Sequence, residues 1–285
     1  MKWGAYWRLM RFNKPAGLLL LWYPTVWALY SSNQGWPPLS LVIFFLIGTI
    51  SMRAAGCVVN DIADRNVDKH VARTKLRPLT TGELGLFSAS VLLVILLSVS
   101  FWALINLPSQ CLNIAVIALI ITAIYPFCKR FLHAPQCILG LAFSIGIPMA
   151  YVASNKSFDL PFYILFMINF LWIISYDTIY ALADKEDDLR IGVQSTAILF
   201  ADHDKSIVGL LQIFTQCLWL YWAYLVSLHN FFYFFWFLAG LVCVYQQKLI
   251  NKRESVKCSK AFDASIYYGA LMSIAIGFGF AGNLI

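Results

Sequence analysis

Two short stretches of the chain hold eight of its 14 Asp and Glu residues. The first has the pattern NDxxDxxxD and the second contains DxxxD, and their polar members are Asn60, Asp61, Asp64 and Asp68, then Asp177, Asp184, Glu186, Asp187 and Asp188. On an α-helix, Asn60, Asp64 and Asp68 share one face, because residues four apart are neighbours there. Asp184 and Asp188 share a face for the same reason. Two rows of carboxylates are therefore predicted.

Such rows need a counter-ion, since like charges at this spacing repel one another and destabilise a helix. Oxygen ligands without Cys or His favour a hard divalent cation, and Mg²⁺ is usual where carboxylates share the ion with substrate phosphates. We therefore predict a magnesium site that also binds a phosphate, with these ligands: Asn60, Asp61, Asp64, Asp68, Asp184 and Asp188. The alternative is a solvated acidic cap, neutralised by the basic residues that follow the first stretch.

Basic residues near both stretches fit the charge of a diphosphate. The candidates are Arg73, Arg77, Lys129 and Arg130, although basic residues at a membrane surface also set topology. Arg53 is different, because it lies seven residues before Asn60 on the same helix face, roughly 10 Å deeper at 1.5 Å per residue. A guanidinium inside a membrane needs a partner. That partner is either a carboxylate of the protein or an anionic group of a substrate.

The elements that carry these residues are membrane spans. Hydrophobic residues make up 60% of the 285 residues and charged residues 12%, against about 25% charged in soluble proteins. Apolar runs long enough to cross a bilayer as helices are expected at 16–33, 39–58, 86–106, 111–128, 135–153, 160–182, 206–229, 232–250 and 265–283. We therefore predict an all-α integral membrane protein with about nine transmembrane helices, and no cleavable signal peptide is recognised.

The basic residues fix the expected orientation. Of 21 Lys and Arg residues, all but Lys156 and Arg53 fall before the first span, in the connections after the even-numbered spans or, for Lys248, at the end of the eighth span. The positive-inside rule makes that side, with both acidic stretches, cytoplasmic. The N-terminus is then inside and the C-terminus outside. The net charge of +7 is thus explained by topology, nucleic-acid binding is not expected, and the Cys and His residues show no metal-ligand spacing.

Equal offsets relate the two acidic stretches. Asp64 and Asp184 are 120 residues apart, as are Asp68 and Asp188, and each stretch closes an even-numbered span. We treat residues 1–285 as one membrane domain, with a possible duplication whose halves cover about 16–130 and 135–260.

At these motifs the sequence resembles the UbiA superfamily of intramembrane aromatic prenyltransferases. The matching segments are MRAAGCVVND at 52–61, RPLTTG at 77–82, YPFCKR at 125–130, YDTIYALADKEDD and STAILF within 176–200, and VYQQKLI at 244–250. The resemblance implies nine helices around a central cavity that opens laterally to lipid under a cytoplasmic cap. It also implies that Asn60, Asp64, Asp68, Asp184 and Asp188 hold Mg²⁺ and diphosphate, that Lys129 contacts the diphosphate, and that Arg53 faces the substrates.

The implied reaction transfers a polyprenyl group from polyprenyl diphosphate to 4-hydroxybenzoate, ortho to its hydroxyl, in ubiquinone biosynthesis at the bacterial inner membrane. Asp184, Asp177 and Arg53 are the expected catalytic residues, with Asp184 or Asp177 orienting or deprotonating the phenol. Two alternatives stay open: another aromatic acceptor within the family, and a cation or phosphate transporter, which also uses acids inside the membrane. Prenyl chain length and oligomeric state are not set by these motifs.

Overall fold

The computed structural model describes residues 3–66, 68–70, 74–128 and 131–282. Within these ranges all regular structure is helical. The helices are α1 (Trp3–Leu9), α2 (Ala16–Asn33), α3 (Leu39–Ala63), η1 (Asp68–His70), α4 (Leu86–Ile105), α5 (Gln110–Cys128), α6 (Pro135–Ser144), α7 (Gly146–Ala153), α8 (Leu160–Ile191), α9 (Thr196–Leu199), η2 (Ala201–His203), α10 (Asp204–Leu225), α11 (Phe231–Ile250) and α12 (Ser255–Ala281). The protein is an all-α integral membrane protein.

Seven helical segments of the described chain are long and apolar enough to cross a membrane. They comprise α3, α4, α6 with α7, α8, η2 with α10, α11 and α12. The predicted spans at 16–33 and 111–128 are also helical, as α2 and α5, but they are not among these seven. The count of nine spans therefore stays a prediction.

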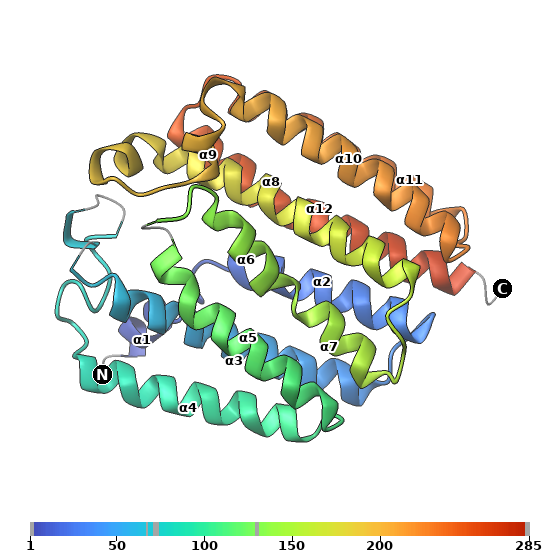
Figure 1. Cartoon of the computed structure of the whole chain (residues 1–285), viewed down its shortest axis with the longest axis horizontal. Coiled ribbons are helices and arrows are strands. Elements are labelled where there is room, and N and C mark those ends of the chain that lie inside the picture. Colours follow the sequence, from blue (N-terminus) through green and yellow to red (C-terminus); the bar gives the residue numbers. More distant parts are fainter. Residues whose placement is uncertain (1–2, 67, 71–73, 129–130, 283–285) are drawn as a thin grey trace.

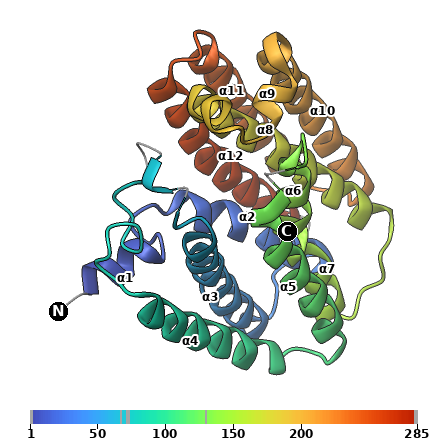
Figure 2. The same cartoon turned by 60° about the vertical axis from the view of Figure 1, so that its left-hand side comes forward.

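The helices form two groups with a third between them (Figures 1 and 2). Helices α8, α10, α11 and α12 gather on one side, and α3, α4 and α5 on the other, while α2, α6 and α7 lie between. Trp27 of α2 is fully buried at the centre, with its ring 5.0 Å from that of Trp172 on α8 and 5.2 Å from that of Trp219 on α10. Its indole nitrogen donates to Ser273 Oγ of α12 at 2.9 Å. This aromatic core joins α2 to the group of α8, α10 and α12.

The predicted span at 135–153 is interrupted. Helix α6 ends at Ser144 and α7 begins at Gly146. Pro148 explains the break, because proline has no N–H to donate to the carbonyl four residues earlier, here that of Ser144, and its ring clashes with that carbonyl. The break falls where α7 meets α2: a Cβ on Gly146 would come within 2.3 Å of Thr25 Oγ1. A larger residue at position 146 would therefore require the Thr25 side chain to move.

The two acidic stretches are built differently. Helix α3 ends at Ala63, so Asp64 is its C-terminal cap and Asp68 begins the separate 3₁₀ turn η1. The prediction that Asp68 continues one helix with Asn60 is therefore wrong. Helix α8 runs on to Ile191 and ends at Gly192 in a left-handed conformation (φ 71°), so Asp184 and Asp188 do share one helix. The connection after α3 and the end of α8 lie at the same end of the molecule (Figure 1).

Candidate active site

A cavity of about 1150 Å³ lies between the helix groups. Basic side chains line it toward the end that carries the acidic stretches: Arg8, Arg11, Lys14, Arg53 and Arg77. Apolar side chains line the rest, among them Phe44, Phe45, Phe101, Leu104, Leu107 and Met149. Since Phe44 precedes Asn60 by 16 residues, the lining follows roughly 24 Å of α3 at 1.5 Å per residue. The cavity thus joins a cationic end to a long apolar compartment.

Asp61 is the centre of an ion-pair network at the cationic end. Its side chain is 1% exposed, and its Oδ1 lies 2.6 Å from Arg11 Nη2 and 3.1 Å from Arg77 Nη1. Arg77 Nη1 also lies 2.7 Å from Asp68 Oδ2. Arg11 stands in a left-handed backbone conformation (φ 61°) between α1 and α2. These contacts hold two guanidinium groups on the wall of the cavity.

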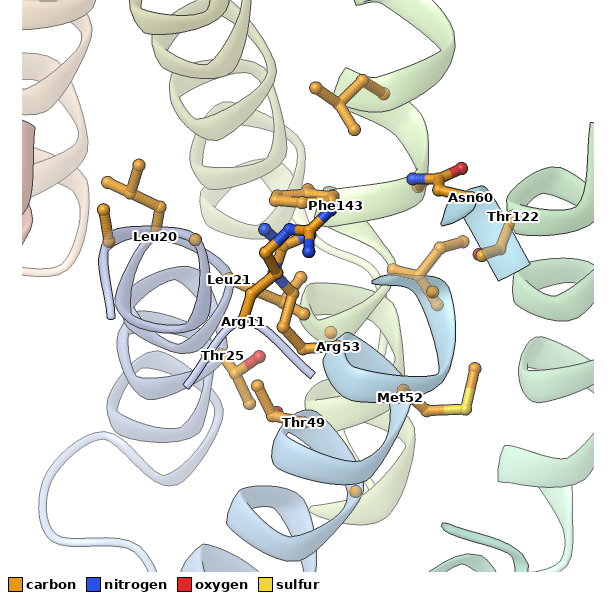
Figure 3. Close-up of a pocket in the computed structure, with 18 of the residues that line it drawn as sticks. Arg11, Leu20, Leu21, Thr25, Thr49, Met52, Arg53, Asn60, Thr122 and Phe143 are labelled. Atoms are coloured by element: carbon orange, nitrogen blue, oxygen red, sulfur yellow. The ribbon is translucent and has the colours of Figure 1, made fainter. Parts of the chain in front are cut away.

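Arg53 projects from α3 into the cavity, where Figure 3 shows it close to Phe143. Its guanidinium carbon lies 5.9 Å from the centre of the Phe143 ring. A Cβ on Gly17 would come within 2.1 Å of Arg53 Nη2, so the missing side chain at position 17 makes room for the guanidinium. Among the described residues no carboxylate forms an ion pair with Arg53. This observation favours the second of its two predicted partners, an anionic substrate group.

Helix α8 brings the second acidic stretch to the same region. Asp177 lines the cavity with its neighbours Tyr176 and Tyr180. Asp184 lies two turns further along α8, and Asp188 one turn beyond it, or roughly 10 and 16 Å from Asp177 along the helix axis. Both are half-buried. The stretch therefore runs from the cavity wall to the end of the helix.

The predicted site residues fall into four groups. Arg53, Asn60, Arg77 and Asp177 line the cavity, and Asp61 and Asp68 form the ion pairs with its arginines. Asp64, Asp184 and Asp188 lie at or near the ends of α3 and α8 on the same side of the molecule. Arg73, Lys129 and Arg130 lie outside the described residues.

The oxygen donors of this region suit a hard divalent cation. Asn60, Asp64 and Asp68 come from one stretch and Asp184 and Asp188 from the other, and all offer oxygen ligands, as Mg²⁺ requires. Asp61 Oδ2 is buried without a hydrogen-bond partner among the described residues. In that part of the chain no three His, Cys, Asp or Glu side chains are gathered closely enough to hold an ion by themselves.

Several charged residues of the cavity were not predicted from the sequence, Arg11 and Asp263 among them. Arg11 was attributed to membrane topology, because it lies in a basic segment before the first span. Asp263 was not singled out, yet it lines the cavity from α12. Its signal was its spacing: Ser259, Asp263 and Tyr267 follow one another at intervals of four, and all three line the cavity.

Comparison with known proteins points to one family. The model of the UbiA prenyltransferase family matches residues 21–275. The chain is 57% identical over 275 residues to a 4-hydroxybenzoate octaprenyltransferase of Legionella pneumophila strain Paris, covering 96% of this chain and 98% of that protein. It is 47% identical over 279 residues to a protein of the same name from Serratia proteamaculans strain 568, covering 98% and 96%.

Solved structures show the same fold. A UbiA homolog from Aeropyrum pernix K1 in its apo form superposes with a TM-score of 0.78 at 22% identity, covering 94% of this chain and 98% of that one. A UbiA homolog from Archaeoglobus fulgidus bound to GPP and Mg²⁺ gives a TM-score of 0.70 at 19% identity, covering 99% and 100%. With the family model matching most of its length, this chain belongs to the UbiA prenyltransferase family.

Proposed function

We propose that this chain transfers a polyprenyl group from polyprenyl diphosphate to the ring carbon ortho to the hydroxyl of 4-hydroxybenzoate, giving 3-polyprenyl-4-hydroxybenzoate for ubiquinone biosynthesis. The observation that carries the proposal is the cavity, which joins a cationic end to an apolar compartment. A polyprenyl diphosphate has the same division into an anionic head and an apolar tail. The relatives at 47% and 57% identity, named for this activity, supply the acceptor.

The head of the substrate belongs at the basic end. Arg77 lines the cavity there, and we assign it to diphosphate binding together with Asn60, Arg73, Lys129 and Arg130. Arg11 joins this set, because its guanidinium is held on the same wall by Asp61. Guanidinium groups bind phosphate oxygens through paired hydrogen bonds. Asp61 has the further task of orienting Arg11 and Arg77.

Mg²⁺ is the cofactor that suits the donors of the two acidic stretches. Asn60, Asp61, Asp64, Asp68, Asp184 and Asp188 are the residues that would hold it, and when bound it would offset the negative charge that develops on the departing diphosphate. A structural neighbour solved with GPP and Mg²⁺ supports the choice of ion.

The acceptor belongs deeper in the cavity, beside Arg53. We assign the carboxylate of 4-hydroxybenzoate to the Arg53 guanidinium, which has no ion pair of its own among the described residues. Phe143 packs against that guanidinium. Asp177, on the wall formed by α8, then orients the phenol hydroxyl or takes its proton, a task we assign to Asp184 as the alternative.

The chemistry is an electrophilic aromatic substitution. The allylic carbon–oxygen bond breaks, diphosphate leaves with the bonding electrons, and the ring carbon forms a bond to the allylic carbon. The ring then loses its hydrogen as a proton. Tyr176 and Tyr180 border this region, and the negative faces of aromatic rings stabilise a cation. The apolar walls exclude water, which would otherwise capture the cation.

The proposed site faces the cytoplasm. The connections that carry most basic residues lie at one end of the molecule with the acidic stretches (Figure 1), and the positive-inside rule places that end in the cytoplasm. We therefore assign the chain to the bacterial inner membrane, with a cytoplasmic N-terminus and a periplasmic C-terminus. Cysteine substitutions at Trp3 and at Asn230, an exposed residue between α10 and α11, labelled from each side of sealed vesicles, test this orientation.

The activity is tested with the purified protein in lipid nanodiscs. Mg²⁺, 4-hydroxybenzoate and octaprenyl diphosphate are added, and prenylated acid is measured by mass spectrometry. We expect one product with the prenyl group ortho to the hydroxyl, and at least a hundredfold loss in Asp64→Ala and Asp184→Ala. Chelation of Mg²⁺ should abolish the product reversibly.

Two outcomes would contradict the proposal. One is the absence of prenylated 4-hydroxybenzoate while another aromatic acid is prenylated, which would leave the family reaction but change the acceptor. The other is a product rate unaffected by both Asp substitutions, which would remove the two acidic stretches from the reaction. Glu186→Gln, at an exposed position on the same helix turn as Asp184, is the matched control and should keep near-normal activity.

A further inference from the structure

A buried carboxylate outside both acidic stretches lies at the start of α10. The Asp204 side chain is 0% exposed. Its Oδ1 accepts the backbone N–H of Lys205 at 2.7 Å, which satisfies one of the N–H donors left unpaired at the helix start. A buried charge of this kind is expensive unless it is paired, and Asp204 is paired twice.

The first partner of Asp204 comes from the second acidic stretch. Lys185, the residue after Asp184, donates from Nζ to Asp204 Oδ2 at 2.9 Å and to the carbonyl oxygen of Ala201 at 2.9 Å. Residues three apart on a helix are neighbours, so the ordinary partner for the Lys185 ammonium would be Asp188. In the structure Lys185 instead forms its ion pair with the carboxylate at the start of α10.

The second partner comes from the turn between α11 and α12. Arg253, in a left-handed conformation (φ 53°), donates to Asp204 from Nε at 3.0 Å and from Nη2 at 2.8 Å. Its Nη2 also donates to the carbonyl oxygen of Asp202 at 2.9 Å. Close by, Ser255 Oγ donates to the carbonyl oxygen of Ala183 on α8 at 2.8 Å. Asp204 thus ties α8 and the α11–α12 turn to the start of α10.

The charges explain why this arrangement matters for the proposed cation site. An ammonium directed toward Asp184 and Asp188 would neutralise part of the charge that binds Mg²⁺, and the two cations would compete. Arg253 alone balances the charge of Asp204, so the bond from Lys185 is not needed to neutralise that buried acid. Its effect is to keep the Lys185 ammonium on the α10 side of α8.

We propose that Asp204 is a positioning residue that holds Lys185 away from Asp184 and Asp188 and so preserves their affinity for Mg²⁺ and diphosphate. The inference rests on the proposed function only through the cation site. It does not depend on the prenyl chain or on the acceptor. Asp204 contacts neither of the proposed substrates and acts through Lys185.

The test measures binding rather than turnover. Mg²⁺ and inorganic pyrophosphate are titrated into the full chain in nanodiscs by calorimetry. For Asp204→Asn we expect the Mg²⁺ dissociation constant to rise about tenfold, as for an added unit charge several ångströms away in a partly screened site. Asp204→Asn combined with Lys185→Met should return to within about threefold of the wild type, because the competing ammonium is gone.

Matched controls separate this effect from loss of structure. Asp202→Asn alters an exposed carboxylate two residues away and should leave the dissociation constant unchanged. Lys185→Arg keeps the charge and the donors and should do the same. Where Asp204→Asn alone does not fold, Asp204→Asn with Arg253→Met is measured in its place, since it leaves no second cation stranded.

Three outcomes overturn the inference. Wild-type affinity in Asp204→Asn means that Lys185 does not compete. Weaker binding in the double variant than in Asp204→Asn means that the network is structural only. A wild-type chain that binds no Mg²⁺ with pyrophosphate removes the cation site, and with it both this inference and that part of the proposed function. If the wild-type chain binds Mg²⁺ and Asp204→Asn binds it with the same dissociation constant, this inference is wrong but the proposed function is unaffected.

Discussion

The two acidic stretches share a spacing of carboxylates but are supported in different ways. In the first, α3 ends at Ala63, and Asp61 and Asp68 form ion pairs with arginines of neighbouring connections. In the second, one continuous helix carries Asp184 and Asp188, and Lys185 of the same helix forms its ion pair with Asp204 on α10. The first stretch therefore holds arginines on the cavity wall, whereas Lys185 of the second stretch is held against α10.

Two similar motifs can thus have different parts in one site. The first stretch brings Arg11 and Arg77 to the wall where we place the diphosphate. In the second, we propose that Asp204 holds Lys185 away from Asp184 and Asp188. A duplication with halves at about 16–130 and 135–260 remains our proposal for the origin of the shared spacing, and the supporting contacts would then be later and separate additions.

The largest effect is expected from Asp61→Asn. It leaves Arg11 and Arg77 without their shared buried carboxylate, and removing one partner of a buried ion pair costs about 3 kcal/mol. We expect a lower apparent melting temperature together with at least a hundredfold loss of prenyl transfer. Differential scanning fluorimetry and the product assay measure the two. Unchanged stability would show that the first stretch does not depend on its ion pairs. It would thus contradict the difference we describe between the two stretches.

Arg53→Ala should change substrate binding without changing stability. Hydrogen bonds to charged groups contribute about 1.5–3 kcal/mol, so the KM for 4-hydroxybenzoate should rise roughly 10- to 100-fold, with an apparent melting temperature close to that of the wild type. Steady-state kinetics with each substrate varied in turn provide the measurement. Parallel loss of folded protein and activity would favour a structural role for Arg53.

Gly17→Ala probes the same guanidinium from its other side. The added Cβ would meet Arg53 Nη2 at 2.1 Å, and because the obstacle is the end of a flexible side chain, Arg53 should move rather than the backbone. We expect a smaller rise in the KM for 4-hydroxybenzoate, on the order of tenfold. Gly209→Ala, where an added Cβ finds no atom closer than 3.5 Å, is the control and should have no effect.

The smallest effect is expected from Glu83→Gln. Glu83 forms an ion pair with Arg8, but both side chains are more than 40% exposed, and exposed pairs contribute little. Stability and activity should stay at wild-type levels. A clear loss in either would mean that the arginines around the first stretch act as one network, with Arg8 included.

Prediction from the sequence recovered most of the fold, because apolar runs and basic connections are direct consequences of a bilayer environment. Helices begin at or near the predicted positions for α2, α3 and α8. It erred at Asp68, because spacing of four is compatible with a helix but does not require one to continue past Asp64. The break before Gly146 follows from Pro148, whose effect on a long apolar run was not taken into account.

Sequence patterns predicted the site less completely than the fold. Asn60, Arg53, Arg77 and Asp177 were predicted to act together, and all four line the cavity. Arg11 was assigned to topology, since a basic residue before a span has that role by default and its partner Asp61 is 50 residues away. The contact of Asp204 with Arg253 joins residues 49 apart. Such pairings follow from the packing of helices, which one sequence does not record.

The apolar walls of the cavity have a consequence for turnover. A prenyl tail that moves from lipid to these walls exchanges one hydrocarbon environment for another, so it gains little free energy, unlike a tail that leaves water. Affinity for the donor must then come mainly from its diphosphate. Once that group has departed, nothing comparable retains the product, which should partition back into the bilayer. We therefore expect weak product inhibition. We also expect the KM for the prenyl donor to change little with the length of its tail.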